Sequence, residues 1–269
     1  GRLAISSLGA NDPESESFTV AQVRNGTLDM ARVNLNVLNS VVPGTVIPTL
    51  PFLFKSTDHM RRTLDGPVGQ EILAGLERHG FIGLALYDGG VRSFYSRRPI
   101  RSAADLKGMN VRVQKADSWE VFLRGLGAKP VMMPMGQVQA GLRTGVIDAA
   151  DADMPTYVAG GHHAVAPYYS MTQHSQPPSV LIFSARAWRL LSADDQRMIR
   201  DSAQESVAFM RSRVDDHEAA SRAQAEASGA RIVDDVDRAS FLNAFVPLYS
   251  SVVEEARLQD TVTRIQADQ

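Results

Sequence analysis

Apolar residues occur along the chain either in short continuous runs or at every third or fourth position, and each pattern predicts a different kind of element. Short runs rich in apolar residues, at residues 81–87, 110–113 and 180–183, predict strands. Residues 57–79 repeat their apolar positions every three or four residues, so this segment is helical in character. The same repeat follows Ser192, a good N-cap, and continues far beyond the average length of a helix. A helix that long can span two lobes of one protein.

Residues 102–151 show the clearest succession of elements. Ser102 and Asp105 begin a short helix as a capping box in which Asp replaces the preferred Glu or Gln, and Gly108 ends it. The elements expected next are a strand at 110–113, a helix capped by Asp117, a strand at 131–133, a helix at 137–143 and a strand at 146–149. This alternation is typical of a parallel sheet with crossover helices, and hence of an α/β fold.

The rest of the chain adds fewer elements to this picture. The pattern predicts a strand at 1–5, a helix at 18–23, a strand at 28–33, a strand at 231–233 and a final amphipathic helix at 241–256. Ligands of parallel α/β sheets bind beyond the carboxyl ends of the strands. The polar residues that follow the predicted strands are therefore the candidates for a site: Arg112, Gln114, Asp117, Asp151 and Asp153.

Composition narrows the class of protein. A chain of 269 residues is long enough for two domains with substantial cores. The 28 Lys and Arg residues and the 30 Asp and Glu residues leave a net charge of -2, so no broad positive field exists to attract nucleic acid. No cysteine is present, which excludes disulfides and thiolate metal sites. No apolar run approaches the about 20 residues of a membrane-spanning helix.

Signatures of catalysis and of metal binding are absent from the sequence. It contains no GxSxG elbow, no HExxH motif, no Walker loop and no GxGxxG after a strand. His162 and His163 are adjacent, so in a regular element they point to different faces, and we expect an exposed loop pair instead of a metal site. We expect neither a cofactor nor a metal ion.

Two arginines are candidates for binding an anion. Arg112 lies inside an apolar strand, between Val111 and Val113, where a long cation needs a partner. That partner is either an anionic ligand or a neighbouring carboxylate in a structural ion pair. Arg92 follows Gly89-Gly90 and on its own reads as an ordinary surface arginine. Two arginines on one carboxylate would give planar, doubly hydrogen-bonded recognition, which serves binding more than catalysis.

Three aspartates are candidates for the polar part of a ligand. Asp117, Asp151 and Asp153 only accept hydrogen bonds when ionised, so they suit the donating hydroxyls of a sugar. The alternative is that they are helix caps and members of a solvated acidic loop, which is the favoured interpretation for Asp117. A hard cation is a poorer match, because the spacing lacks the glycine-centred calcium loop.

Several segments resemble one family. The stretches LKGMNVRVQ (106–114), GAKPVMMPMGQVQAGLRTGVIDAAD (127–151) and VRNGTLDMARVN (23–34) are similar to the signature segments of TRAP (tripartite ATP-independent periplasmic) solute-binding proteins of the DctP type. The similarity extends to LSADDQRMIRDSA (191–203). The segments YDGGVRSFYSRRPI and PYYSMTQHS resemble a branch that binds hexuronic acids such as glucuronate and galacturonate.

The resemblance implies a fold and an activity. The fold would be the two-lobed periplasmic-binding-protein (Venus flytrap) fold, with a ligand cleft between the lobes and a long helix spanning both. Lobe I would comprise residues 1–89 and 178–217, and lobe II residues 90–177 and 218–269. The protein would capture a small organic carboxylate and deliver it to the TRAP membrane permease subunits. It would act as a periplasmic monomer, with its leader and the family's first strand and helix preceding this chain.

The resemblance also implies which residues bind. Arg112 takes the place of the arginine that pairs with the ligand carboxylate, and Arg92 that of a second arginine. The positions that line the pocket in the sialic-acid-binding branch are occupied here by Glu16, Asn34, Ala116 and His174. The family's Glu-Asn pair is Asp151-Ala152 in this chain, and Asp153-Met154 replaces an Asn-Trp pair common in the uronate branch.

Two other functions compete with the binding protein. One is an enzyme that acts on sugar acids through an acid-base pair such as Asp151 and His174. The other is a sensor domain of the same fold, which a fused signalling segment would reveal. The binding protein is favoured because the sequence has no signature of catalysis and because the resemblance to the family covers nearly the whole chain.

Overall fold

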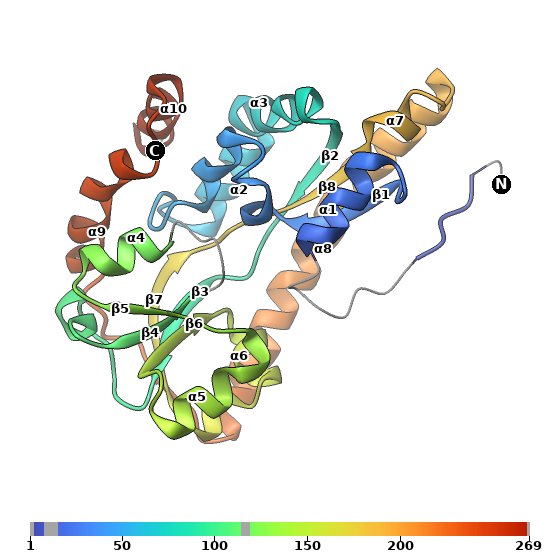
Figure 1. The fold of residues 1–269 in the computed structure, drawn as a ribbon. Coiled ribbons are helices and arrows are strands. Elements are labelled where there is room, and N and C mark those ends of the chain that lie inside the picture. The colour runs from blue at the N-terminus through green and yellow to red at the C-terminus, as the bar shows by residue number, and fades with distance from the viewer. Residues whose placement is uncertain (1–2, 8–15, 114–118, 268–269) are drawn as a thin grey trace. The chain divides into compact units, whose positions relative to one another are not determined.

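The structure, a computed structural model, describes residues 3–7, 16–113 and 119–267 (Figure 1). The chain forms two compact units. Unit 1 comprises Gly1–Val46, Asp58–Gly89 and Pro177–Ser212, and unit 2 comprises Ile47–Thr57, Gly90–Gln176 and Arg213–Gln269. The division expected from the sequence placed residues 47–57 with the first lobe, whereas in the structure they cluster with unit 2.

Unit 1 contains a three-stranded antiparallel sheet. Its strands, in spatial order, are β1 (Met30–Asn34), β8 (Ser179–Ser184) and β2 (Phe81–Tyr87). Strand β2 reads FIGLALY and is almost entirely buried, as its apolar run predicts. The helices are α1 (Glu16–Asn25), α2 (Thr57–Asp65), α3 (Pro67–Gly75) and α7 (Ala185–Trp188).

The helical character predicted for residues 57–79 is confirmed, and the segment is divided into separate helices. Helix α2 ends before Gly66, and α3 begins at Pro67. Proline has no N–H to donate to the preceding turn, so it interrupts a helix but is well placed in the first turn of a new one. A short 3-10 helix, Glu77–His79, then connects α3 to β2.

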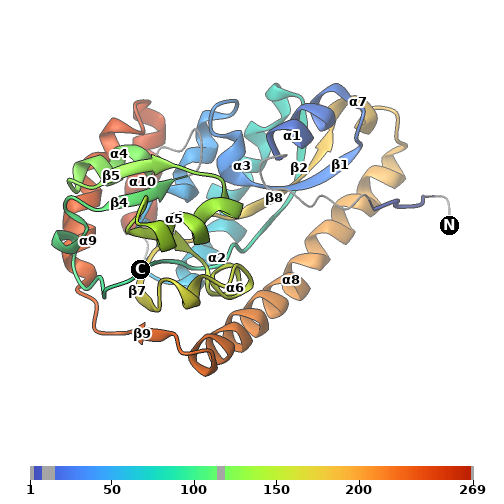
Figure 2. The ribbon, with the colours of Figure 1, turned by 60° about the horizontal axis from the view of Figure 1, so that its bottom comes forward.

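The long helix predicted after Ser192 is confirmed. Helix α8 (Ala193–Ala227) has 35 residues and runs without a break (Figure 2). Ser192 caps it, because its hydroxyl oxygen accepts the backbone N–H of Asp195 at 3.2 Å. The first part of α8 belongs to unit 1, and the part from Arg213 onward belongs to unit 2.

Unit 2 is built on a six-stranded mixed sheet. Its strands, in spatial order, are β5 (Lys129–Met132), β4 (Asn110–Val113), β6 (Ala149–Ala152), β3 (Arg92–Ser96), β7 (Tyr168–Ser175) and β9 (Arg231–Val233). Strand β4 is parallel to β5 and β6, as the alternation of strands and helices predicted. The sequence prediction covered only these three strands, and the whole sheet is mixed because β3 runs antiparallel to β6 and β7.

Each face of this sheet carries its own aromatic core. Phe94 of β3 stacks on Trp119 of α4 (Trp119–Gly125) and on Phe241 of α9 (Arg238–Phe245). The next residue, Tyr95, packs on Tyr157 of α6 (Met154–Ala159). Successive side chains of a strand point to opposite faces, so α4 and α9 cover one face and α6, with α5 (Val138–Thr144), covers the other (Figure 1).

Two predictions at the chain ends are wrong, and one in the middle is confirmed. The final helix predicted at 241–256 is instead α9, a 3-10 helix (Val246–Ser251) and α10 (Ala256–Ala267), because Pro247 interrupts the first of them. The described part of the strand predicted at 1–5 has no regular structure. The capping box is present: the backbone N–H of Ser102 donates to Asp105 Oδ2 at 2.8 Å.

Candidate ligand-binding site

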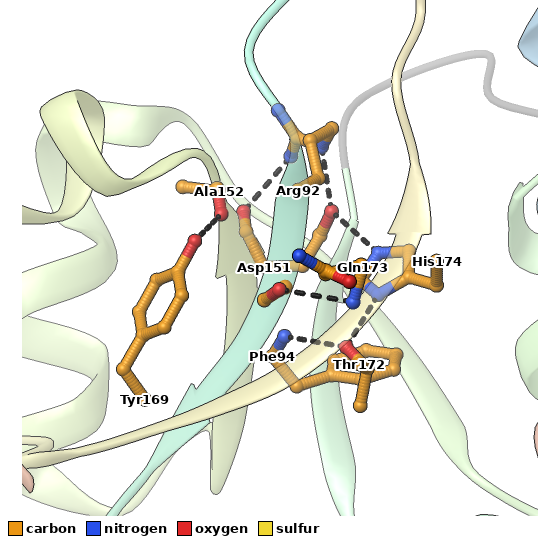
Figure 3. A network of polar contacts seen from close by, with 9 residues as sticks. Arg92, Phe94, Asp151, Ala152, Tyr169, Thr172, Gln173 and His174 are labelled. Atoms are coloured by element: carbon orange, nitrogen blue, oxygen red, sulfur yellow. Dashed lines mark hydrogen bonds and ion pairs between the residues drawn. The ribbon is translucent and has the colours of Figure 1, made fainter. Parts of the chain in front are cut away.

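The centre of the unit 2 sheet carries a buried ion pair. Arg92 begins β3, and Asp151 lies on the neighbouring strand β6, opposite Phe94. The Nε of Arg92 donates to Asp151 Oδ2 at 2.7 Å, and its Nη2 donates to the backbone O of Asp151 at 2.8 Å (Figure 3). The Asp151 side chain is 5% exposed and that of Arg92 is 21% exposed. These two hydrogen bonds hold the plane of the Arg92 guanidinium.

His174 of β7 completes this network. Its Nε2 lies 3.3 Å from Asp151 Oδ2, and its Nδ1 lies 2.9 Å from the hydroxyl of Thr172 (Figure 3). The imidazole is fully buried and is stacked on Phe94, with ring centroids 4.4 Å apart, and on Trp119, at 4.8 Å. The structure thus brings together three residues predicted from the sequence, Arg92, Asp151 and His174.

A bulge in β7 places Thr172 and His174 beside β3. Arg92 pairs with Ser175, but Phe94 pairs with Ser170, so β7 contains extra residues between these two pairs. Gln173 lies inside the bulge with a φ of 45°, in the left-handed region that non-glycine residues rarely adopt. Its backbone N–H donates to the Ser93 hydroxyl at 3.0 Å, which stabilises this conformation.

The network sets the protonation states of its acidic and basic members. Burial alone would raise the pKa of Asp151, but the charge of Arg92 and the hydrogen bond from His174 hold that pKa well below its usual range. Burial lowers the pKa of His174 more than the hydrogen bond and charge of Asp151 raise it. At neutral pH Asp151 is therefore ionised and the His174 imidazole is neutral.

Arg112 is buried in the same sheet, as its apolar neighbours predicted. It is 2% exposed, and its Nε donates to the backbone O of Met133 at 2.8 Å. Burial and the charge of Asp151 raise the pKa of the Tyr95 hydroxyl, and the charges of Arg92 and Arg112 both oppose that rise. Both cations are therefore within electrostatic reach of one hydroxyl group in unit 2.

The expectation of an exposed histidine pair is wrong for His162. This residue is 2% exposed, and its Nδ1 lies 2.8 Å from the hydroxyl of Tyr95, on which its ring also stacks. Burial, followed by the positive charge of Arg112, lowers the pKa of His162 to about 4. Adjacent residues can be buried to different extents, and here His162 packs into the aromatic core around Tyr95. His163 is half-buried.

Asp153 is the N-cap of α6. Its Oδ1 accepts the backbone N–H of Thr156 at 2.8 Å, which corresponds to the capping alternative considered for these aspartates. The residue also packs closely on Gly90, where a Cβ would lie 2.5 Å from that of Asp153. Whether Asp153 also contacts a ligand stays a prediction.

We expect Asp153→Ala to destabilise the protein by about 1 kcal/mol, because the Thr156 N–H loses its acceptor. Asp153→Asn is the matched control, since asparagine caps helices as well as aspartate does. Urea-induced unfolding of both variants measures the difference. Equal stabilities of the two variants would contradict a capping role.

If Asp153 also binds sugar hydroxyls, Asp153→Asn should change the order of affinities for epimeric sugar acids.

Glu16 and Asn34 meet in unit 1. The carboxylate oxygens of Glu16 accept the backbone N–H of Asn34 at 3.3 and 3.4 Å. The side-chain oxygen of Asn34 accepts the N–H of Asn36 at 2.9 Å and caps a 3-10 helix, Leu35–Leu38. Burial raises the pKa of Glu16, against the lowering effect of the Asn34 N–H. Both residues stay predicted ligand contacts.

Gln114, Ala116 and Asp117 lie outside the described residues. Thr172 is a member of the network that the sequence did not indicate, because a threonine in a mixed polar and aromatic segment carries no distinguishing pattern. The only sequence signal for it is its position two residues before His174.

One family of known proteins matches nearly the whole chain. Residues 1–256 match the model of the DctP family, described as bacterial extracellular solute-binding protein, family 7. The chain belongs to this family. As a family 7 protein of the TRAP type, it has a fold that matches those of solved TRAP solute-binding proteins, which confirms the resemblance seen in the sequence. Members of the family are extracellular components of transport systems that bind small acids and work with membrane permeases.

Individual members of the family show how far the similarity extends. A solute-binding protein of Chromohalobacter salexigens is 33% identical over 92% of this chain and 74% of its own length. A TRAP solute-binding protein of Xanthobacter autotrophicus, solved with bound β-D-galacturonate, is 43% identical, with a TM-score of 0.88 over 94% of this chain and 85% of that one. A protein of Roseobacter denitrificans, solved with bound β-D-glucuronate, is 36% identical, with a TM-score of 0.88 over 94% and 84%.

Within the described ranges 3–7, 16–113 and 119–267, no helix of this family 7 protein is long and apolar enough to cross a membrane. In the same ranges, histidine and acidic side chains do not gather into a group of three or more that could hold a metal ion.

Proposed function

We propose that this protein is the periplasmic binding component of a TRAP transporter and that its ligand is a hexuronate such as glucuronate or galacturonate. The observation that carries the proposal is the similarity to the galacturonate-bound structure from Xanthobacter autotrophicus, at 43% identity over 94% of the chain. Structures with bound glucuronate, at 36% and 32% identity, support the same ligand class.

In this proposal the ligand carboxylate is bound by Arg112, with Arg92 as the second cation. Arg112 lies on a buried strand, where its charge is poorly screened by water and therefore acts strongly on an anion. A guanidinium offers two parallel N–H groups that match the two oxygens of a carboxylate. Asp151 orients Arg92 through two hydrogen bonds, so this guanidinium loses little freedom on binding.

Polar groups of the sugar would meet the other predicted contacts, Glu16, Asn34, Gln114, Asp117 and Asp153. Carboxylate and amide oxygens accept hydrogen bonds from hydroxyl groups, which a hexuronate has in addition to its carboxylate. A ligand with one carboxylate and several hydroxyls fits such a mixed set better than a plain dicarboxylate does.

Binding without turnover is also part of the proposal. The rival enzyme would use Asp151 and His174 as an acid-base pair. His174 is fully buried between two aromatic rings, and Asp151 is already engaged by Arg92 and His174. The pKa of Asp151 is held far below neutrality, so this carboxylate would be a poor general base. The partners proposed are the permease subunits, to which the protein would deliver its ligand as a monomer.

A thermal-shift screen against glucuronate, galacturonate, sialic acid and C4 dicarboxylates tests the ligand class. A ligand at about 100 times its Kd stabilises the folded state by about 2.7 kcal/mol. For units of this size that corresponds to a rise in Tm of about 5–10 °C. We expect this rise with a hexuronate and a much smaller one with dicarboxylates. A shift with dicarboxylates alone would contradict the proposal, and consumption of a uronate by the purified protein would favour the enzyme.

A further inference from the structure

A chain of four hydrogen bonds joins the backbone of β3 to the guanidinium of Arg92. It runs from the Phe94 N–H to the Thr172 hydroxyl, then to His174, to Asp151 and to Arg92 (Figure 3). We propose that Thr172 is a positioning residue for ligand binding, whose hydroxyl fixes the tautomer and the ring plane of His174 and, through Asp151, the orientation of Arg92. Its consequence for affinity rests on the proposed function of Arg92.

At the first end of the chain, the bond from the Phe94 N–H has a fixed direction. The backbone N–H of Phe94 can only donate, and it donates to the oxygen of Thr172 at 3.2 Å. The Thr172 oxygen is therefore an acceptor in this bond, and its single O–H hydrogen remains to be donated elsewhere. The Nδ1 of His174, at 2.9 Å, is the acceptor that the structure offers to it.

The other end has a fixed direction as well. Asp151 is ionised, so its Oδ2 only accepts, and the Nε2 of His174 at 3.3 Å must carry the hydrogen between them. Because the buried imidazole is neutral, it has one N–H hydrogen, and Nδ1 is then a bare acceptor. The bond to Asp151 therefore requires the tautomer with its hydrogen on Nε2, and the Thr172 hydroxyl, which can donate to the bare Nδ1, is compatible with that tautomer.

Packing makes this arrangement sensitive to the loss of one bond. His174, Thr172 and Phe94 are all fully buried, so water is excluded as a substitute for a missing partner. The aromatic rings of Phe94 and Trp119 restrain the tilt of the imidazole but not its rotation within its own plane. The two hydrogen bonds at Nδ1 and Nε2 supply that second restraint.

Thr172 is also a stiff anchor. A β-branched side chain has few accessible χ1 rotamers, so its hydroxyl stays where the bulge in β7 puts it. Valine has nearly the same shape without the hydroxyl, and serine has the hydroxyl without the methyl group. Thr172→Val and Thr172→Ser therefore form a matched pair that separates hydrogen bonding from packing.

Nitrogen-15 NMR of the ligand-free protein observes the tautomer directly. The chain has six histidines, and the signals of His174 are assigned by their absence from a His174→Gln variant. We expect His174 of the natural protein and of Thr172→Ser to be protonated at Nε2, with a hydrogen-bonded Nδ1. In Thr172→Val we expect the Nδ1 signal to move to that of a nitrogen without a hydrogen bond, or to average between two tautomers. Protonation at Nδ1 in the natural protein would overturn the inference even if Thr172→Val failed to fold.

Calorimetric titration with the hexuronate identified by the thermal-shift screen measures the consequence for binding. We expect Thr172→Val to bind about tenfold more weakly, the scale seen when a residue that orients a metal ligand is removed, and Thr172→Ser to recover most of the affinity. Equal affinity of the natural protein and Thr172→Val, or an unchanged His174 spectrum in that variant, would overturn the inference. If none of these proteins binds a sugar acid, the proposed function fails, and the nitrogen spectra alone decide whether Thr172 orients His174.

Discussion

Asp151→Ala is expected to destabilise unit 2 by about 3–5 kcal/mol, the cost of breaking a buried ion pair by removing one partner. The Arg92 guanidinium would lose its anionic partner, and His174 would lose the acceptor of its Nε2–H, in a region that excludes water. Unfolding in urea measures the effect. The chain has two tryptophans, Trp119 in unit 2 and Trp188 in unit 1, so a Trp188→Phe background makes the fluorescence report on unit 2 alone.

Asp235→Ala is the matched control for this experiment. Asp235 forms an ion pair with Arg101 at 2.8 Å, but both side chains are at least half exposed. Surface pairs of this kind contribute little because water screens them, so the unfolding midpoint should stay close to that of the natural protein. A similar loss of stability in both variants would contradict the special role of the buried pair.

The effect of Asp151 should also depend on pH in a defined direction. Its pKa is lower in the folded than in the unfolded protein, so its contribution to stability is fully present above the unfolded pKa, about 3.9. The contribution is lost as the pH falls through the folded pKa. The stability difference between the natural protein and Asp151→Ala should therefore be constant near neutrality and shrink only below about pH 4.

Arg112→Lys is expected to weaken binding of a hexuronate by about 2–3 kcal/mol, the scale of one charge-assisted hydrogen bond. Lysine keeps the positive charge but presents a point charge in place of the planar pair of N–H groups. It also cannot reproduce the Nε hydrogen bond to the Met133 carbonyl in the same geometry. Calorimetric titration of the folded variant gives the difference in affinity.

Arg143→Lys is the matched control for Arg112→Lys. Arg143 lies on the exposed surface of α5, where its Nη2 donates to Gln139 at 3.3 Å. Its replacement should leave the affinity unchanged. If Arg112→Lys also bound with full affinity while remaining folded, Arg112 would be a structural residue, and the carboxylate would have to be bound elsewhere.

Much of the fold could be predicted because its strands and its longest helix carry strong local patterns. The apolar runs of β2, β4 and β8 and the helical period of α8 need no knowledge of distant residues. Strands β3 and β7 were missed for the opposite reason. The sequence RSFYS, for example, mixes polar and aromatic residues, and four of its five residues are nonetheless buried between two other strands.

The candidate site could be predicted only in part, because several of its residues depend on contacts with residues that are distant in the sequence. Arg112 stands out because a cation interrupts an apolar strand. Arg92 reads as a surface residue until its partner Asp151 is known, and that partner lies 59 positions along the chain. His174 depends on a bulge whose backbone conformation at Gln173 has no sequence signature. The burial of His162 likewise follows from its contact with Tyr95, a distant residue.

The order of the segments that form each unit has a consequence for how the chain folds. Strand β8 lies between β1 and β2 and pairs Phe183 with Met30, so the sheet of unit 1 closes only after most of the chain has been synthesised. Strands β3 to β7, in contrast, come from one uninterrupted stretch, residues 92–175. Contacts between distant residues form slowly because long loops must close first. These five neighbouring strands of unit 2 can therefore assemble while β1 and β2 still have unpaired edges, because β8 has not yet been synthesised.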